Sequence, residues 1–305
     1  MKLGIIGGAG LLGSTTAFYV AINSLVDEIV LYDVRENYAL NHAMDMEHAI
    51  CDFSETVITS GDFSALEGSD IILNTAGAPE SHRASRDEYI EDNLPIYKDI
   101  AEKIKSWGSF PVIISTSSPV DPLNFKLHEF IGGPRNRYLG LSYNDTLRFK
   151  WSVAKELGLS STLIDGIVLG EHGSYAVPIF TSLKRTDTGE AIILTEQQRQ
   201  SVKNRPLEWF SDLMALKTTR TMGWTSGLWL GKIVEAIVNE TDTIFPCSCI
   251  PEGEYGLSEV SLALPLKLGR EGFREIIEMP LDESEQQALN EASDKIKSLI
   301  AKTTT

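Results

Sequence analysis

The sequence has few cysteines and no long apolar run, and each scarcity excludes a class of protein. Three cysteines among 305 residues cannot form a disulfide framework, so we expect reduced thiols in a cytoplasmic setting. Cys247 and Cys249 have no histidine beside them, and no metal site is expected. No apolar run approaches the roughly 20 residues of a transmembrane helix. The strand-like segment at residues 3–6 predicts that no signal peptide precedes the fold.

Positive charge is scarce as well. Lysine and arginine number 27 against 43 aspartates and glutamates, and the formal net charge is -16. This excess argues against nucleic acid or an anionic membrane surface as a partner. An anionic small molecule would need arginines that concentrate positive charge in one pocket. The length, with a hydrophobic content of 42%, is enough for a large core and for two domains.

A glycine-rich stretch follows the first expected strand, residues 3–7. Gly8, Gly10 and Gly13 fit the pattern G-x-G-x-x-G, and Gly7, Gly10 and Gly13 fit a G-x-x-G-x-x-G variant. A helical run over residues 14–21 comes next. A tight turn that aims a helix amino terminus at a pyrophosphate needs glycines in this context. The stretch therefore predicts a dinucleotide site.

An acidic residue ends the second expected strand. Glu28 to Tyr32 is followed by Asp33, about twenty residues after the last glycine. A carboxylate there can accept both ribose hydroxyls of adenosine and repels a 2'-phosphate. This favours NAD over NADP, although the nearby Arg35 leaves the choice open.

Strands alternate with helices through the first half, which predicts a doubly wound parallel sheet of the Rossmann type. We expect a dinucleotide-binding domain over residues 1–141 and a mixed α/β substrate domain over residues 142–305. Leu40, Ala43 and Met44 are expected on one face of a helix. Pro206 is expected to interrupt or bend the helix that a capping box opens at Thr195. Further strands are expected at residues 56–59, 71–75, 112–114, 138–141, 164–169, 177–180, 245–250 and 262–268, and further helices at residues 87–105, 144–157 and 282–300, with one more ending near residue 239.

A histidine flanked by glycines lies between two apolar runs. His172 separates residues 164–169 from residues 177–180, and the pattern predicts a hairpin that projects an imidazole from a rigid frame. The alternative is a loop histidine without a function. Asp145 and Arg148 are three apart on an expected helix and share one face. They form either an ordinary surface ion pair or a polar pair that points toward His172.

The segment from Glu80 to Arg86 is polar and precedes a long helix. This profile is typical of a mobile lid that carries positive charge, and the alternative is a solvated loop. The tryptophans Trp151, Trp209, Trp224 and Trp229 are interpreted as core or interface residues, because the net charge excludes a base-stacking surface.

With these motifs in hand, the chain resembles the malate/lactate dehydrogenase family from end to end. Six segments fall in the order and spacing of the family: the glycine loop with Asp33, Thr75-Ala76-Gly77-Ala78-Pro79, Asp145-Thr146-Leu147-Arg148-Phe149, Gly170-Glu171-His172-Gly173, Glu252-Gly253-Glu254-Tyr255-Gly256, and Pro265 to Gly272.

The resemblance implies roles for individual residues. His172 would give a proton to the substrate oxygen and take it back, and Asp145 would hold its ring. Arg148 would clamp the substrate carboxylate with its guanidinium fork, and Arg86 would polarise the carbonyl under a closed lid. The implied cofactor is NAD, with contacts from Gly7, Gly8, Gly10, Leu11, Leu12, Gly13, Asp33, Thr75, Ala76, Gly77, Asn93 and Ser118.

Two departures from the family concern the substrate. Glu80 stands where malate enzymes carry an arginine and lactate enzymes usually a glutamine, and Ser118 replaces the usual asparagine before Pro-Val-Asp. Glu80 would repel a dicarboxylate, so we hypothesise that Arg83 or Arg220 neutralises it or receives a second carboxylate. We count Glu80, Arg83, Ser118 and Arg220 among the substrate-binding residues, with Arg148 and Arg86.

The resemblance implies an NAD-dependent L-2-hydroxy acid dehydrogenase that acts as a homodimer or homotetramer on a small 2-hydroxy or 2-keto acid. Two alternatives stay open. One is a non-catalytic paralogue that keeps the fold, and the other is a dehydrogenase of altered specificity for a cationic or bulky substrate tail.

Overall fold

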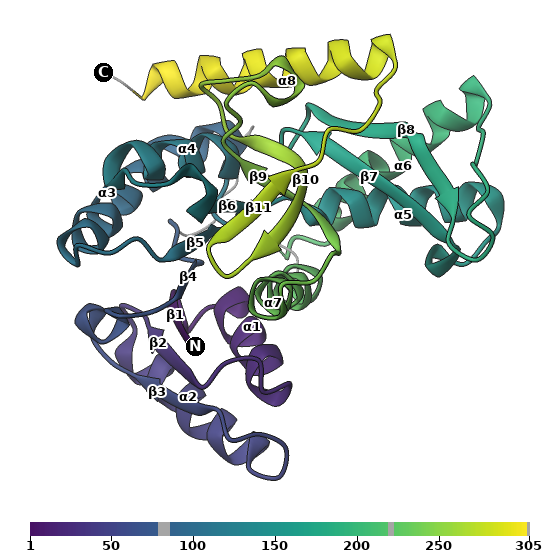
Figure 1. The fold of residues 1–305 in the computed structure, drawn as a ribbon. Helices are drawn as coiled ribbons and strands as arrows, with labels where there is room; N and C mark the ends of the chain where they lie inside the picture. The colour runs from purple at the N-terminus through teal and green to yellow at the C-terminus, as the bar shows by residue number, and fades with distance from the viewer. Residues whose placement is uncertain (79–85, 219–222, 304–305) are drawn as a thin grey trace.

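A computed structural model describes residues 1–78, 86–218 and 223–303, apart from the side chains of residues 86 and 87. Within these residues, strands from both halves of the chain form one 11-stranded sheet in the order β3-β2-β1-β4-β5-β6-β9-β10-β7-β8, with β11 paired to β10. Helices cover both faces of this sheet (Figure 1). The predicted α/β fold is confirmed.

The first half is the parallel part of the sheet, and its strand order 3-2-1-4-5-6 is that of a doubly wound dinucleotide-binding fold. Strands β1, β2, β4, β5 and β6 of this part are largely buried on both faces, as their continuous apolar runs require, whereas the edge strand β3 exposes Val57 and Thr59. The strands are β1 Lys2–Ile6, β2 Glu28–Tyr32, β3 Val57–Ser60, β4 Ile71–Asn74, β5 Val112–Ser115 and β6 Tyr138–Leu141. The helices are α1 Leu11–Ile22, α2 Glu36–Ile50, α3 Ile90–Ser106 and α4 Val120–Ile131, with short 3-10 turns η1 Phe63–Leu66, η2 Arg86–Tyr89 and η3 Arg135–Arg137.

The second half extends the same sheet with antiparallel strands, beginning where β9 pairs with β6. Its strands are β7 Ile164–Gly170, β8 Ala176–Arg185, β9 Ile244–Cys249, β10 Leu262–Gly269 and β11 Gly272–Ile276. Its helices are α5 Tyr143–Leu157, α6 Glu196–Ala215, α7 Trp224–Asn239 and α8 Glu283–Lys302, with 3-10 turns η4 Ser161–Leu163 and η5 Glu254–Gly256. Helix α7 packs against α1 of the first half (Figure 1). A division into two domains near residue 141 stays a prediction.

The apolar face expected on α2 is only partly buried. Leu40 and Met44 of α2 are 48% and 56% exposed, and only Ala43 of the predicted set is buried. The buried face consists of Ala39, Ala43, Met46 and Ile50. The helix carries apolar residues on two sides, and its alanines face inward because they let the helix approach the sheet closely.

Helix α6 runs without interruption through Pro206. Of the two predicted outcomes, the interruption is therefore wrong, and the bend stays a prediction. A proline at this position leaves the carbonyl of Val202 without its helical partner. The hydroxyl of Ser152 on α5 donates to that carbonyl at 2.9 Å. The neighbouring helix thus replaces the hydrogen bond that the proline removes. Helix α4 and strand β11 were not predicted.

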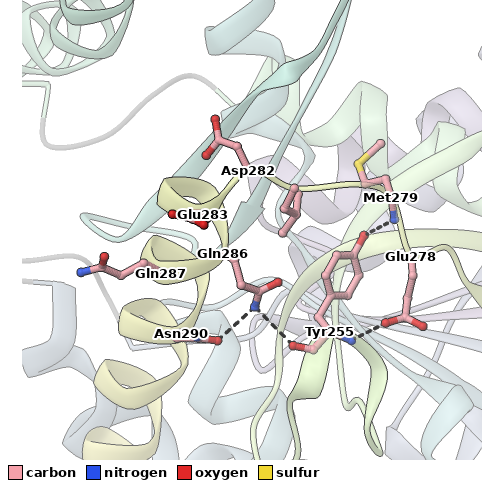
Figure 2. Close-up of a pocket in the computed structure, with 9 residues that line it drawn as sticks. Tyr255, Glu278, Met279, Asp282, Glu283, Gln286, Gln287 and Asn290 are labelled. Atoms are coloured by element: carbon pink, nitrogen blue, oxygen red, sulfur yellow. Dashed lines mark hydrogen bonds between the residues drawn. The ribbon is translucent and has the colours of Figure 1, made fainter.

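Tyr255, in the motif at residues 252–256, anchors the segment that leads into α8. Its hydroxyl donates to the carbonyl of Ile277 at 2.8 Å and accepts from the Met279 N–H at 3.0 Å. Its own N–H donates to Glu278 at 2.7 Å (Figure 2). A hollow of about 640 Å³ lies beside it, lined by polar, acidic and apolar side chains that include none of the predicted site residues. This motif therefore has a structural part in the fold.

No helix in the described ranges is both long enough and apolar enough to cross a membrane. The same ranges contain no cluster of histidine, cysteine, aspartate or glutamate side chains that could hold a metal ion.

Candidate active site

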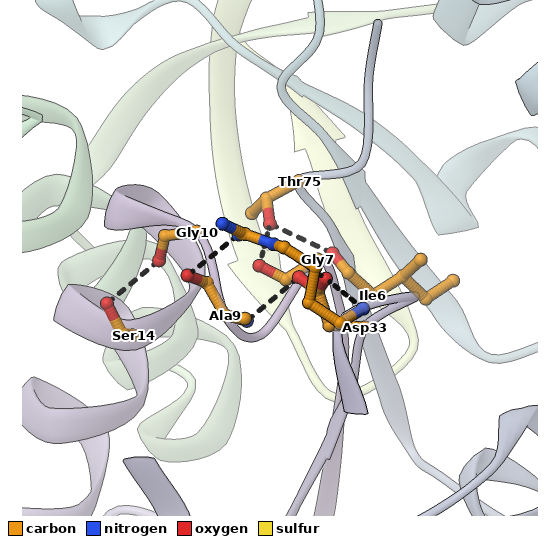
Figure 3. Close-up of polar contacts among 8 residues, drawn as sticks. Ile6, Gly7, Ala9, Gly10, Ser14, Asp33 and Thr75 are labelled. Carbon is orange, nitrogen blue, oxygen red and sulfur yellow. Dashed lines mark hydrogen bonds and ion pairs between the residues drawn. The ribbon is translucent and has the colours of Figure 1, made fainter. Parts of the chain in front are cut away.

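The glycine loop is packed so closely that side chains would not fit. The Gly7 and Gly8 N–H groups donate to the Tyr32 carbonyl at 2.9 Å, and Gly10 N–H donates to the Gly7 carbonyl at 2.9 Å. A Cβ on Gly13 would lie 2.5 Å from the Gly7 carbonyl oxygen. Gly7 itself has a φ of +86°, where only glycine is unstrained. The loop joins β1 to α1 as the sequence predicts (Figure 3).

The amino terminus of α1 offers a site for an anion. Gly10 is the N-cap, and no side chain caps the first turn. The N–H groups of Leu11, Leu12 and Gly13 have no helical acceptors, because they belong to the first turn. Together with the positive end of the helix dipole they suit a pyrophosphate. The predicted cofactor residues at this turn therefore fit a dinucleotide.

Asp33 lies at the carboxyl end of β2 and is held by the glycine loop. Its Oδ2 accepts from the Ala9 N–H at 3.0 Å, and its Oδ1 accepts from the Arg35 N–H at 2.9 Å. The Arg35 guanidinium donates to the Ala9 carbonyl at 3.0 Å (Figure 3). Arg35 is thus tied back to the loop and to Asp33, and the carboxylate stays at the edge where an adenosine ribose would bind. This arrangement suits NAD rather than a 2'-phosphate.

The next predicted cofactor residues gather at the carboxyl ends of β4 and β5. The Thr75 hydroxyl donates to the Ile6 carbonyl at 2.9 Å, next to the glycine loop. Asn93 on α3 bridges two segments, because its Oδ1 accepts from Ala78 N–H at 2.7 Å and its Nδ2 donates to the Ser118 carbonyl at 2.7 Å. Ala76 and Gly77 lie between these ties, and a Cβ on Gly77 would approach Asn93 Oδ1 to 3.2 Å. The structure therefore brings Thr75, Asn93 and Ser118 to one edge of the sheet.

His172 lies in the hairpin that the sequence predicts. Strands β7 and β8 pair antiparallel, and residues 171–175 connect them. Gly170 has a φ of +85°, and a Cβ on it would lie 2.9 Å from the Tyr175 carbonyl oxygen. The Glu171 carboxylate accepts from the Tyr175 N–H at 2.8 Å. These contacts fix the short loop that carries the imidazole.

One carboxylate joins the histidine to the arginine. Asp145 Oδ2 lies 2.5 Å from His172 Nδ1, and Asp145 Oδ1 accepts from Arg148 Nη1 at 3.0 Å. The Nδ1 proton therefore points at Asp145, and Nε2 is the nitrogen left to face a substrate. Asp145 and Arg148 stand one turn apart on α5, and their side chains are largely buried. The interpretation of this pair as an ordinary surface ion pair is wrong.

Trp209 contacts the same arginine, which sequence reasoning did not predict. The Arg148 guanidinium carbon lies 5.3 Å from the centroid of the Trp209 ring, within the range of a cation–π contact. Trp209 is 37% exposed and is therefore not a core residue. No local pattern could have revealed the contact, since α5 and α6 are distant in sequence.

Asp121, at the start of α4, is a second carboxylate held against His172. Its Oδ2 accepts from the His172 main-chain N–H at 2.7 Å, and its Oδ1 has no hydrogen-bond partner among the described residues. Burial raises the Asp121 pKa to about 7, although the nearby Ser248 hydroxyl and the His172 N–H lower it. From the sequence, Asp121 is identified only as the aspartate of the Pro-Val-Asp motif that follows Ser118, and no role is predicted for this residue.

Because the Asp121 pKa is raised in the folded state, we expect Asp121→Asn to stabilise the protein above neutral pH. The folded state binds the proton more tightly than the unfolded state, so wild-type stability falls as the pH rises from about 4 to about 7. Asparagine keeps an oxygen for the His172 N–H but cannot ionise. Thermal unfolding from pH 5 to 8 should show a Tm advantage of Asp121→Asn that grows up to about pH 7 and then levels off, with a gain of about 2–3 kcal/mol between pH 5 and pH 7.

Asp52→Asn, at an exposed carboxylate, is the control for this series and should show no such growth. A constant difference between Asp121→Asn and wild type across the pH range would contradict the assignment.

Four of the predicted substrate residues cannot be placed completely. Glu80, Arg83 and Arg220 lie outside the described residues. The backbone of Arg86 begins η2, but its side chain is not described. The lid and the displaced second cation therefore stay predictions.

Comparisons with known proteins match the two halves of the chain to the two domains of one protein family. Residues 1–140 match the family of the lactate/malate dehydrogenase NAD binding domain, and residues 144–305 match that of the lactate/malate dehydrogenase alpha/beta C-terminal domain. The chain is 31% identical to malate dehydrogenase from Halobacterium salinarum, with 97% of each chain covered. It is 32% identical to malate dehydrogenase from Symbiobacterium thermophilum, over 98% of this chain and 96% of that protein.

Solved structures share the fold over nearly the whole chain. Malate dehydrogenase from Salinibacter ruber superposes with a TM-score of 0.86 at 28% identity, over 99% of this chain and 97% of that one. Lactate dehydrogenase from Cryptosporidium parvum, complexed with lactic acid and nicotinamide adenine dinucleotide, gives a TM-score of 0.90 at 25% identity, over 98% and 96%.

Proposed function

This chain belongs to the lactate/malate dehydrogenase family, and we propose that His172, Asp145 and Arg148 carry out the family's reaction in it. The protein is an NAD-dependent oxidoreductase that acts on the CH–OH group of a 2-hydroxy acid. The roles are assigned from one observation: the carboxylate of Asp145 contacts both His172 and Arg148.

NAD, when bound at the glycine loop, supplies the hydride acceptor, and its reduced form supplies the hydride donor. His172 Nε2 protonates the oxygen of the 2-keto group during reduction and removes that proton during oxidation. Asp145 holds the Nδ1 proton and stabilises the imidazolium form. Arg148 presents its guanidinium to the substrate carboxylate, which fixes the reacting carbon beside the imidazole.

The cofactor contacts proposed for the glycine loop, Asp33, Thr75, Asn93 and Ser118 are supported by their common place at the carboxyl ends of β1, β2, β4 and β5. For Arg86 we keep the role of polarising the substrate carbonyl. Glu80, Arg83 and Arg220 remain candidates for substrate specificity, as their positions in the sequence suggest.

The proposal is tested by following NADH oxidation with oxaloacetate, pyruvate and larger 2-keto acids, and by repeating the assay with NADPH. Turnover of at least one acid, with NADH strongly preferred over NADPH, is the expected result. NADH binding without turnover of any 2-keto acid would instead support the non-catalytic paralogue.

We also propose that the chain forms a homodimer or homotetramer in the cytoplasm. Large apolar side chains are exposed on α1, α2 and α7, among them Phe18, Met44, Trp224 and Leu228. Such side chains on neighbouring elements are typical of a protein interface. Light scattering of the purified protein would contradict this proposal if it gave a monomer mass at micromolar concentration.

A further inference from the structure

We propose that Trp209 is a specificity residue, which fixes Arg148 and forms an apolar wall that selects 2-keto acids with an apolar side chain over dicarboxylates. The inference rests on the proposed function, because it takes Arg148 as the group that binds the substrate carboxylate.

The first step concerns how the Arg148 guanidinium is held. Asp145 accepts from its Nη1 at 3.0 Å, and the Trp209 ring lies 5.3 Å from its central carbon. No partner for its Nη2 and Nε lies in the described part of the chain. An ion pair at one nitrogen and an aromatic ring beside the group restrict it to few orientations, with the remaining donors left for a carboxylate.

The second step places the substrate relative to the tryptophan. Asp145 holds both Arg148 and His172, so the carboxylate carbon and the keto carbon of a bound acid must lie beside this one side chain of α5. The substrate tail begins at the next carbon. Because Trp209 contacts the arginine itself, a tail of a few carbon atoms is within reach of its ring.

The third step concerns charge along α6. Residues 206–216, which include Trp209, contain no lysine, arginine or histidine. Leu207, Phe210 and Leu216 in this stretch are exposed large apolar side chains. The charged residues of this stretch are Glu208 and Asp212, so it offers the Trp209 ring beside Arg148 and no cation for a second carboxylate.

The cations of the preceding turns of α6 already have other contacts. Arg199 and Lys203 both lie over the Phe180 ring, at 5.1 and 5.5 Å from its centroid. Arg205 donates to the Ser152 carbonyl and to the Glu156 carboxylate. None of them is placed to bind a carboxylate next to Arg148. The wall beside the substrate arginine is thus aromatic, and an apolar tail of branched aliphatic or aromatic type fits it best.

The experiment measures KM and kcat of the wild type, Trp209→Phe and Trp209→Ala with oxaloacetate, pyruvate, 4-methyl-2-oxopentanoate and phenylpyruvate. We expect the wild type to prefer the two larger apolar acids to oxaloacetate by at least about tenfold in kcat/KM. Trp209→Ala should raise KM for the apolar acids by about 10- to 30-fold and for pyruvate by about threefold, with kcat changed little. In Trp209→Phe, which keeps an aromatic ring, KM for the apolar acids should stay close to the wild-type value.

Trp107→Phe, at a tryptophan that packs on Phe63 away from Arg148, is the matched control and should behave like the wild type. A wild-type preference for oxaloacetate would overturn the inference and would favour a displaced arginine, Arg83 or Arg220. An equal fall in kcat/KM with all four acids in Trp209→Ala would also overturn the inference. Absence of turnover with every acid, while NADH still binds, would instead be a failure of the proposed function.

Discussion

Replacing His172 by asparagine should lower kcat for 2-keto acid reduction by about 10²- to 10⁴-fold, the range that general acid catalysis supplies. Asparagine can still donate a hydrogen bond to Asp145, but it has no acidic group at the position of Nε2 that could transfer a proton. The main-chain bond from His172 N–H to Asp121 survives the change, because it does not involve the side chain. The fold and the cofactor site should therefore be unaffected.

Steady-state kinetics of His172→Asn, with NADH affinity measured by fluorescence on the same samples, separate these effects. The control is His128→Asn, because His128 lies on α4 and contacts the Gly133 carbonyl rather than the site. Comparable kcat values in wild type and His172→Asn would exclude His172 as the proton donor. A parallel loss of NADH affinity would show that the substitution had disturbed the structure of the loop at residues 171–175, rather than proton transfer alone.

The parts of the site that could be predicted from the sequence are formed by residues that are close together in the chain. The turn from Gly7 to Gly13, the Asp33 position and the hairpin around His172 each follow from a strand, a turn and the next element. Local backbone sterics fix such units, so the pattern of residues contains the needed information. Asp145 and Arg148 share a helix face for the same reason.

The parts that could not be predicted depend on contacts between distant segments. Asp121 and His172 meet across 51 positions of the chain, and nothing local marks the Asp121 carboxylate as buried. The apolar face of α2 that includes Leu40 and Met44 is mostly exposed, and the sequence could not show this because an exposed apolar face and a core face can have the same composition. The helix continues through Pro206, where Ser152 on another helix supplies a donor for the Val202 carbonyl.

Two carboxylates from different elements hold His172 in place. Asp121, on α4 beside the cofactor edge, accepts from its main-chain N–H, while Asp145, on α5, accepts from its ring. Asp121 follows Ser118 by three positions, and the Ser118 carbonyl is bound by Asn93. The proposed proton donor, His172, and the edge that would bind the nicotinamide are therefore linked through one short segment. This explains how a histidine from the second half of the chain keeps its position relative to a cofactor bound by the first half.

Arg148→Lys should lower kcat/KM for every 2-keto acid by about 10²- to 10³-fold, mainly through KM. Lysine keeps the charge but loses the fork, and its one ammonium group would be drawn to Asp145 instead of the substrate. One lost charge-assisted hydrogen bond costs about 1.5–3 kcal/mol, and the lost stacking on Trp209 costs about 1 kcal/mol. The sum corresponds to the expected factor, since each 1.4 kcal/mol is about tenfold.

Arg205→Lys is the matched control for this variant, because Arg205 lies at the same α5–α6 contact and is buried to a similar degree. Among the described residues it bonds to Glu156, Ser201 and Ser152 rather than to Asp145. It should retain nearly wild-type kcat/KM. Because Arg148 is proposed to bind the carboxylate that all 2-keto acids share, its loss should not change the order of preference among them. A change in that order, with the overall rate preserved, would mean that Arg148 contacts the substrate tail and that the carboxylate binds elsewhere.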